Sequence, residues 1–420
     1  MAIGYACKLA GVPGTKLKGM VLSNADEKLI GGTIAYNLKI LGNMIEYNIS
    51  KDIRLFRISS DIIPFGSHEI NTHEWWKDYE MELAGLGSRI RSAGMRVSMH
   101  PGQYTVLNSP DEGVVGRCVA DLVYHARFLD ALGVDSANKI ILHVGGVYGD
   151  RGNALKRFES NWQGLPEQVK SRLVIENDEK CFNINEVLQL GTRLGIPVVY
   201  DNLHSSINPP DSGPVDHTEW IGSCKHTWKP EDGRQKIHYS QQSAKGQKGA
   251  HSDTIYIRPF LEFYKGIREL DPDIMLEVKD KNISALKCIN CTGDDVKRVT
   301  LEKEWASWKY AVMERSYRLY KEIGSMFRGT ELPDAVSFYE RVEEAGAMEY
   351  DIGSAINTAE HVWGYFKNKA GEAERKRYLK LLGEAGNDIN KIINLKRFLF
   401  RLAEKYDEKY LIGAYYFMEV

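Results

Sequence analysis

The sequence predicts an α/β fold, a (β/α)8 TIM barrel with a C-terminal all-helical extension. Three observations support this prediction. Short runs rich in Ile, Val, Leu and Met recur up to about residue 278, amphipathic helical stretches separate them, and polar residues gather where the runs end. Alternating strands and helices are typical of α/β proteins, and polar residues at strand ends are typical of the functional mouth of a barrel.

Eight short apolar runs have the pattern of strands. Several are apolar on both faces, as strands of a buried parallel sheet are. Their number matches a closed barrel of eight strands. The predicted strands are Ala2–Cys7, Ile53–Ser59, Arg96–His100, Lys139–Val144, Arg172–Asn177, Pro197–Asn202, Lys236–Tyr239 and Ile274–Val278.

Amphipathic helical patterns lie between these runs. The first begins after the Ser23–Asp26 capping region, and Gly94, Gly133 and Gly195 follow the ends of three others, as expected of C-terminal caps. Strand, helix and glycine therefore repeat along the chain. The predicted helices are Glu27–Ile45, Trp75–Ala93, Pro110–Leu132 and Val187–Leu194.

Two segments depart from this alternation. Residues 208–249 are long, polar and rich in Gly, Pro, Lys and His, and such a segment in a compact domain is usually functional or disordered. From residue 301 no strand pattern appears, so we expect residues 1–300 to form the barrel and residues 301–420 the helical extension. The helices predicted there are Trp305–Gly324, Ala335–Ala345, Ser354–Ala370, Glu372–Leu382 and Asp388–Tyr406.

Composition narrows the class of protein. The 420-residue chain has a formal net charge of −2, so nucleic-acid binding cannot be argued from overall charge. It has no apolar run of transmembrane length, and its N-terminus has the pattern of a strand rather than of a signal peptide, so we expect a cytoplasmic protein with no membrane partner. The six cysteines are irregularly spaced, which indicates reduced thiols rather than a disulfide framework.

Two of the most apolar runs end in a glutamate. Glu176 and Glu277 each come at the end of a nearly continuous apolar stretch. Burying a charge there is costly unless something compensates it, and either a salt bridge or a divalent metal could do so. Asp201 and His238 end two further strands. The four together favour a metal.

Imidazoles follow other predicted strands. His100 and His143 end two runs, His204 comes three residues after Asp201, and His68 follows the second run. Imidazoles and carboxylates without cysteine suit a divalent metal centre, and enough ligands for more than one metal indicate metal-assisted hydrolysis of a phosphate ester. The remaining histidines away from strand ends are expected to be structural or at the surface: His73, His125, His217, His226 and His361.

A Pro-Gly turn follows His100 and carries Gln103 and Tyr104 at its tip. Two interpretations are open. The two side chains could be pushed into a DNA duplex to fill the space left by extruded bases. Alternatively, Tyr104 packs against its own loop and Gln103 is solvated, which the local sequence alone favours.

Eight stretches resemble the UV damage endonuclease family. They span residues 1 to about 290, and they are highly specific in combination and in order, whereas the tail resembles the family poorly. They are Ile3–Cys7 (IGYAC), Phe56–Asp61 (FRISSD), Ser98–Tyr104 (SMHPGQY), Leu142–Gly146 (LHVGG), Ile175–Asp178 (IEND), Tyr200–His204 (YDNLH), Lys236–Ser240 (KIHYS) and Met275–Lys281 (MLEVKDK).

The resemblance implies a barrel like that of type-IV AP endonucleases, with two or three divalent metals per chain, often manganese. The ligands that it implies are His100, His143 and Glu176 for one metal, Glu176, Asp201, His238 and Glu277 for a second, and His204 and His251 for a third, with His68 close by.

The resemblance also assigns residues that contact DNA. Tyr5, Gln103 and Tyr104 match residues that probe the lesion. Lys236 lies two residues before His238, so both point to the same side of the strand. It would contact a substrate phosphate or be carboxylated into a metal-bridging group, and with Glu176 and His68 it forms the expected catalytic set.

The activity implied is incision of double-stranded DNA immediately 5′ to a lesion, leaving a 3′-hydroxyl. The substrates would be cyclobutane dimers and 6-4 photoproducts, with abasic sites as a further substrate. A monomer without an organic cofactor is expected. Cations of the 208–249 segment would follow the phosphate backbone or simply be solvated: Lys225, Lys229, Arg234, Lys245 and Lys248.

Two other enzyme classes remain open. A general abasic-site endonuclease would differ only in its substrate pocket. A sugar isomerase or epimerase of the same barrel type needs one metal, for which Glu176, Asp201, His238 and Glu277 suffice. The number of metals bound per chain separates the isomerase from the nucleases. A damage-binding protein without catalysis would gain little from so many buried acids.

Overall fold

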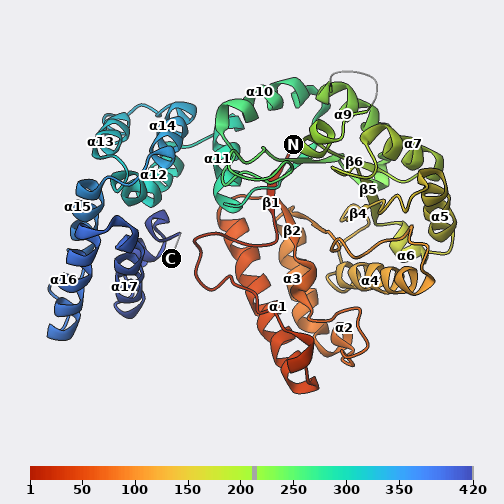
Figure 1. The fold of residues 1–420 in the computed structure, drawn as a ribbon, viewed down its shortest axis with the longest axis horizontal. Helices are drawn as coiled ribbons and strands as arrows, with labels where there is room; N and C mark the ends of the chain where they lie inside the picture. The colour runs from red at the N-terminus through yellow and green to blue at the C-terminus, as the bar shows by residue number, and fades with distance from the viewer. Residues whose placement is uncertain (211–214, 419–420) are drawn as a thin grey trace. The chain divides into compact units, whose positions relative to one another are not determined.

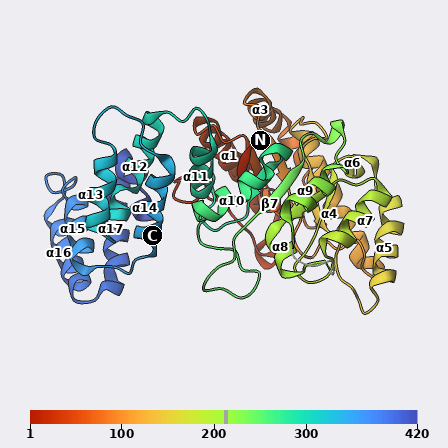
Figure 2. The same cartoon turned by 90° about the horizontal axis from the view of Figure 1, so that it is seen from above.

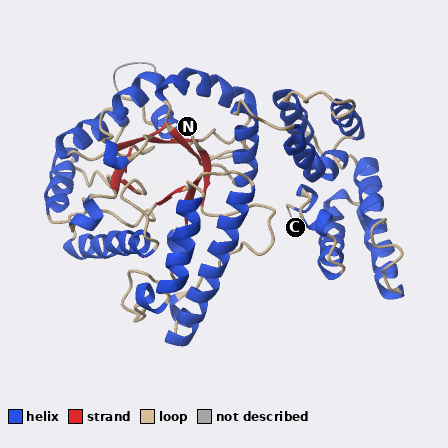
Figure 3. Cartoon of the chain, turned by 180° about the vertical axis from the view of Figure 1, so that it is seen from behind, coloured by secondary structure: helices blue, strands red, loops and turns tan. Residues whose placement is uncertain are grey.

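The computed structural model describes residues 1–210 and 215–418. Eight parallel strands close into a barrel in chain order, which confirms the predicted fold class. The strands form a ring inside a layer of helices (Figure 3). They are β1 (Ile3–Ala6), β2 (Leu55–Ile58), β3 (Arg96–Met99), β4 (Ile140–His143), β5 (Leu173–Glu176), β6 (Val198–Asp201), β7 (Lys236–Tyr239) and β8 (Asp273–Leu276).

Helices follow the strands around the barrel (Figure 1). Side-chain caps start several of them: Asp26 accepts a hydrogen bond from the Leu29 amide, and Asn183 and Glu186 form a capping box. The longer ones are α1 (Glu27–Ser50), α3 (Glu80–Ser92), α4 (Glu112–Ala131), α5 (Arg151–Gln163), α7 (Ile184–Leu194), α9 (His217–Lys225), α10 (Ile257–Ile267) and α11 (Asn282–Thr292).

Two local predictions differ from the structure. The helix expected over residues 75–93 is divided into α2 (Trp75–Asp78) and α3, because Tyr79 leaves helical geometry and donates its hydroxyl to the Gly31 carbonyl. In the segment 208–249, residues 211–214 lie outside the described residues, and the described remainder is less irregular than its composition indicates, since it contains α9, which is capped by Asp216. Its apolar positions are too few to give a clear helical period.

Side-chain alternation divides each strand between the interior of the barrel and the surrounding helices. Ile141, Val174 and Val199 form one apolar cluster from three neighbouring strands. Two residues further along those strands come His143, Glu176 and Asp201. The polar side chains therefore lie one layer above the apolar cluster, toward the C-terminal mouth.

The chain divides into two compact units. The barrel unit contains Met1–Leu9, Gly14–Ile255 and Glu262–Leu286, and the helical unit contains Ala10–Pro13, Tyr256–Leu261 and Lys287–Val420. The boundary expected at residue 300 remains a prediction. None of the described helices is both long and apolar enough to cross a membrane.

The helical unit has two apolar cores, one around Trp305 and Phe338 and one around Leu395 and Tyr416. Its helices are labelled in Figure 2: α12 (Arg298–Met313), α13 (Tyr317–Met326), α14 (Ala335–Ala347), α15 (Ile352–Trp363), α16 (Glu372–Asn387) and α17 (Ile392–Lys405).

The helix predicted over residues 305–324 is interrupted between α12 and α13. The Glu314 carboxylate pairs with Lys396, and the Ser316 side chain caps α13 by accepting from the Leu319 amide. Serine at a helix start offers the backbone a partner that a continuous helix would not need. The apolar period alone does not reveal this stop.

Candidate metal centre

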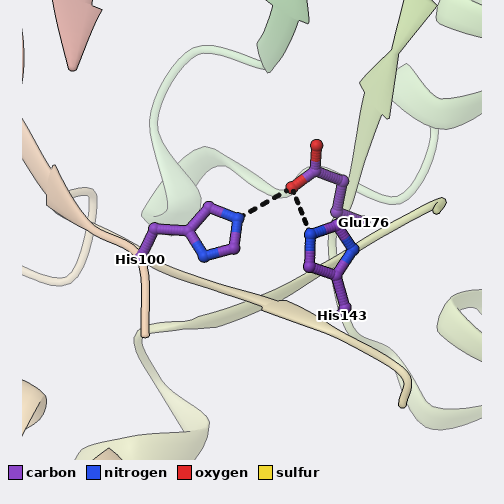
Figure 4. Close-up of side chains that lie close together, drawn as sticks. All are labelled: His100, His143 and Glu176. Atoms are coloured by element: carbon purple, nitrogen blue, oxygen red, sulfur yellow. Dashed lines mark hydrogen bonds and ion pairs between the residues drawn. The ribbon is translucent and has the colours of Figure 1, made fainter. Parts of the chain in front are cut away.

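Glu176 lies at the centre of the barrel mouth, at the end of β5, and is almost fully buried. Its Oε2 atom lies 3.1 Å from His100 Nε2 and 3.8 Å from His143 Nε2. Both imidazoles point toward this oxygen (Figure 4). The other ring nitrogen of His100 lies 3.0 Å from the Pro101 carbonyl oxygen, which orients the ring with Nε2 toward Glu176. These three side chains can converge on one cation.

The second oxygen of Glu176 faces another group. Oε1 lies 2.6 Å from His238 Nδ1, and Asp201 completes a set whose ligand atoms lie within 4.8 Å of one another. Asp201 ends β6 and also caps the short helix α8 (Asn202–Ile207), accepting from the His204 amide through Oδ1 at 2.8 Å. The Oδ2 atom is buried and has no hydrogen-bond partner among the described residues. Glu176 thus belongs to both groups.

The electrostatic surroundings of Asp201 suit the binding of a cation. Burial raises the pKa of Asp201 to about 7, although the charge of His204 opposes the shift. For Glu176, burial raises the pKa, but the neighbouring His238 and His143 outweigh it and hold the pKa well below its usual value. The donors are nitrogen and oxygen atoms, without sulfur, as divalent metals such as manganese and zinc accept. The residues therefore fit a divalent metal.

Arg57 is the fixed cation of the site. Its Nη2 atom lies 2.6 Å from Glu277 Oε1 and 2.8 Å from His238 Nε2. Burial raises the pKa of Glu277, but the charges of Arg57 and His238 outweigh burial and lower it. The FRISSD motif resembled the family at the end of β2, but it did not assign a role to Arg57. The structure places it between two candidate ligands.

His204 and His251 lie at the edge of the centre. His204 Nδ1 is 3.8 Å from Glu176 Oε1, and its Nε2 is 3.7 Å from Glu179 Oε2. His251 Nε2 is 3.6 Å from Glu277 Oε2. The structure thus brings each of the eight predicted metal ligands within ion-pair distance of another one. Glu179 was not predicted, because it belongs to the loop beyond β5 and has no periodic signal.

His68 and Tyr5 occupy different surroundings from those expected. His68 is exposed on the loop after β2, where its Nδ1 atom accepts from the Ile70 amide at 3.1 Å. Tyr5 is fully buried, and its hydroxyl donates to Asn48 on α1 at 2.7 Å. Because Ala6 pairs with Arg57, which faces the interior, Tyr5 faces the helices. This placement leaves Tyr5 no surface for contact with DNA.

Gln103 and Tyr104 are both exposed on the turn after β3. The Thr105 amide donates to the Gly102 carbonyl and closes a turn around them. Tyr104 is 84% exposed, so the ring does not pack against its own loop. The ring is therefore accessible from solvent.

Lys236 begins β7 and lies below His238 inside the barrel. The side chain is fully buried, and Nζ has no hydrogen-bond partner in the part of the chain that the structure describes. Burial lowers its pKa well below the usual value. A buried amine of this kind is either neutral or modified.

A hydrogen-bonded chain supports the candidate ligand His100 from outside the mouth. The Ser60 hydroxyl donates to the His100 carbonyl at 2.7 Å, and His125 Nε2 lies 2.9 Å from the same hydroxyl. The structural role expected for His125 agrees with this position. Its link to His100 crosses from α4 to two loops, so no sequence spacing indicates it.

Comparison with known proteins agrees with this geometry. A model of the family described as UV-endonuclease UvdE matches residues 17–306, and a model described as a protein of unknown function matches residues 309–419. The chain is similar to a UV DNA damage endonuclease of Clostridium perfringens (strain 13 / Type A), with 39% identity over 388 residues, 91% of this chain and 92% of that protein.

Two further similarities cover a smaller share of the chain. A UV DNA damage endonuclease of Bacillus velezensis is 32% identical over 248 residues, 58% of this chain and 77% of its own length. The solved structure of SacUVDE is 38% identical, covers 69% of this chain and 97% of its own, and superposes with a TM-score of 0.65. The resemblance expected from the eight sequence stretches is confirmed, and this chain belongs to the UV-endonuclease UvdE family.

Proposed function

We propose that this protein is a DNA repair endonuclease that hydrolyses the phosphodiester bond immediately 5′ to UV photoproducts. Its substrates are cyclobutane dimers, 6-4 photoproducts and abasic sites in double-stranded DNA. The observation that carries the proposal is the pair of ligand groups that share Glu176. A sugar isomerase needs only one such group, whereas two adjacent cations suit phosphodiester hydrolysis.

The ligand assignment follows from the two faces of the Glu176 carboxylate. His100 and His143 lie on the Oε2 side, and His238 lies on the Oε1 side with Asp201 and Glu277. His204 and His251 serve a third position at the edge. Divalent cations, manganese in our assignment, supply Lewis-acid activation of water and charge neutralisation at the phosphate when bound.

The protein's own residues orient this centre. Arg57 holds Glu277 and His238 by donating to both, so neither can turn away from the mouth. The carbonyl of Asn177 lies 3.0 Å from His204 Nδ1 and fixes that ring. Beneath the centre, Ile141, Val174 and Val199 form a fully buried apolar layer that supports the ligand-bearing strand ends.

Gln103 and Tyr104 supply selectivity in this proposal. A photoproduct weakens base pairing, so extruding damaged nucleotides costs less than extruding intact ones. An exposed aromatic ring at the tip of a turn can fill the space that they leave. The buried Nζ of Lys236 has no hydrogen-bond partner among the described residues, so in this proposal Lys236 contacts a substrate phosphate or, once carboxylated, would supply a further metal ligand.

The experiment compares incision of four end-labelled duplexes with added manganese. They carry a thymine dimer, a 6-4 photoproduct, an abasic site or no damage. We expect cutting 5′ to each lesion, and we expect Glu176→Gln to lower the rate of incision by at least ~10³-fold. Glu176 belongs to both ligand groups, so its loss should remove several kcal/mol of transition-state stabilisation. Glu46→Gln is the matched control, since Glu46 is a surface residue of α1 paired with Arg89.

The other outcomes separate the alternatives. Cutting only at the abasic site would make the protein a general abasic-site endonuclease. No cutting of any duplex, with one metal bound per chain, would contradict the nuclease assignment.

A further inference from the structure

The turn that carries Gln103 and Tyr104 borders a cavity of about 610 Å³ in the barrel unit. The cavity is lined by Gly102, Tyr104 and Thr105 of the turn and by Asp121 of α4, among others. Protein interiors are close-packed, and a segment beside open space has fewer packed neighbours to hold it in place. Hydrogen bonds must therefore fix the position of this turn.

Thr105 fastens the turn to α4. Its hydroxyl donates to Asp121 Oδ2 at 2.6 Å, and its amide donates to the Gly102 carbonyl at 3.0 Å. The Thr105 side chain is buried, and the Asp121 side chain is 23% exposed. A hydroxyl that donates to a carboxylate forms a charge-assisted hydrogen bond, which is shorter and stronger than a bond between neutral groups. The residue after Tyr104 thus closes the turn through its backbone and anchors it through its side chain.

The same helix supports the other end of the turn. His125 follows Asp121 by four residues on α4, so the two side chains share one face of the helix. His125 Nε2 lies 2.9 Å from the Ser60 hydroxyl, which donates to the His100 carbonyl at 2.7 Å. His100 comes just before the turn. Both ends of the turn therefore depend on hydrogen bonds that lead to α4.

The second oxygen of Asp121 has a different partner. The Ser67 hydroxyl, on the loop after β2, donates to Asp121 Oδ1 at 3.0 Å. Because each carboxylate oxygen accepts a hydrogen bond, the group is restrained from rotating away from Thr105. The two bonds also differ in what they hold, since one reaches the turn and the other reaches a neighbouring loop. They can be removed one at a time.

We infer that Asp121 and Thr105 are positioning residues that determine how strongly the protein prefers damaged to intact DNA. They hold the turn in the geometry in which the exposed Tyr104 ring can enter a weakened duplex. A turn that is ordered beforehand avoids the entropy cost of being ordered on the DNA. This role rests on the proposed function, in which Gln103 and Tyr104 probe the duplex. A mobile turn would weaken binding to damaged DNA, where insertion occurs, more than binding to intact DNA.

The test measures binding of the full-length protein, with manganese, to a dimer-containing duplex and to an intact duplex by fluorescence anisotropy. Both duplexes carry a methylphosphonate linkage at the bond 5′ to the dimer position, which resists hydrolysis, so binding is measured apart from cleavage. A second copy of the damaged duplex carries 2-aminopurine opposite the dimer. Its fluorescence rises when the base is unstacked, so it reports insertion of the turn.

The variants separate the two hydrogen bonds of the carboxylate. Thr105→Val removes the hydroxyl at nearly constant volume, Asp121→Ala removes the acceptor, and Thr105→Ser restores a hydroxyl. Ser67→Ala is the matched control, because it removes the other bond to Asp121 and leaves the bond to Thr105. Circular dichroism and thermal unfolding check that each variant is folded.

We expect the preference for the damaged duplex to fall about tenfold in Thr105→Val and in Asp121→Ala, which corresponds to about 1.4 kcal/mol, and to stay within about twofold of wild type in Thr105→Ser and Ser67→Ala. The rise in 2-aminopurine fluorescence should shrink in the first two variants only. The double variant Thr105→Val/Asp121→Ala should lose no more than either single variant, because all three lack the same bond.

A preference in Thr105→Val equal to that of wild type overturns the inference. An equal loss of preference in Ser67→Ala also overturns it, because Asp121 would then act as a general anchor of the loops. Wild-type protein that binds both duplexes equally well contradicts it too. Wild-type protein that prefers the damaged duplex but does not cut an unmodified dimer-containing duplex would contradict the proposed nuclease and leave this positioning role in place.

Discussion

The two units differ in how far cationic side chains compensate their buried carboxylates. In the helical unit, Glu314 is matched by Lys396 at 2.9 Å. In the barrel mouth, Glu176, Asp201 and Glu277 converge with one arginine, Arg57, between them, and Asp201 Oδ2 has no partner in the described chain. A closed ion pair needs nothing further, whereas an excess of buried carboxylates needs added cations. The comparison teaches that the imbalance of buried charge, rather than its presence, marks the reactive site.

Metal removal should affect activity most strongly. Chelation by EDTA, followed by dialysis, should lower the rate of incision of a dimer-containing duplex by at least ~10³-fold. Added manganese should restore that rate. Bound metal also stabilises the folded state. Compared with protein at a free metal concentration a hundred times the dissociation constant, the metal-free protein should have a free energy of unfolding lower by about 2.7 kcal/mol. Metal content by plasma mass spectrometry and urea unfolding provide the two measurements. Incision at full rate with metal-free protein would contradict the comparison.

Breaking the pair in the helical unit should destabilise it. Lys396→Met removes the ammonium that pairs with the buried Glu314 carboxylate, so we expect a loss of about 3–5 kcal/mol in the free energy of unfolding. Urea unfolding followed by far-UV circular dichroism measures this loss. The double variant Lys396→Met/Glu314→Gln removes both charges and should regain most of it. If the single and double variants were equally unstable, the pair would not be the relevant contact.

Asp201→Asn should act in opposite directions with and without metal. In metal-free protein the substitution removes a buried charge that no residue fully compensates, so stability should rise by about 1–3 kcal/mol. Asparagine keeps the cap on α8. With manganese bound, the same variant should be less stable than wild type and should bind less metal. Thermal unfolding in EDTA and in manganese distinguishes the two effects, and equal shifts in both would argue against Asp201 as a ligand.

Substitutions of Tyr5 and Tyr104 should have the smallest effects. They compare a buried tyrosine with an exposed tyrosine of the same barrel unit. Tyr5→Phe removes the hydroxyl bonded to Asn48 and should cost about 1 kcal/mol of stability, with incision unchanged. Tyr104→Ala should leave stability within about 0.5 kcal/mol, because an exposed side chain is removed, and should lower the preference for damaged over intact DNA. Competition between labelled duplexes measures that preference. A loss of preference in Tyr5→Phe would restore Tyr5 as a DNA contact.

The sequence by itself determined the barrel and the end at which polar groups gather. Parallel strands present their C-terminal ends together, and side chains alternate along each strand, so Glu176, Asp201 and His238 could be assigned to one mouth before any contact was known. The extension was recognisable as helical because its apolar period has no strand character. The interruption of the helix at Glu314 and the presence of α9 were not recognisable from the sequence. Helix capping and tertiary pairing outweigh the periodic apolar pattern at both places.

The tertiary structure alone decided which atoms meet. The barrel closes because β1 pairs with β8 as well as with β2. This closure brings Arg57 at β2 close to Glu277 and His238, which lie at the ends of β8 and β7. The register of β1 with β2 sets which face Tyr5 occupies, and a shift of one residue would reverse it. The contact of His125 with Ser60 joins a helix to a loop. Such contacts depend on distances across the fold, which no local spacing in the sequence encodes.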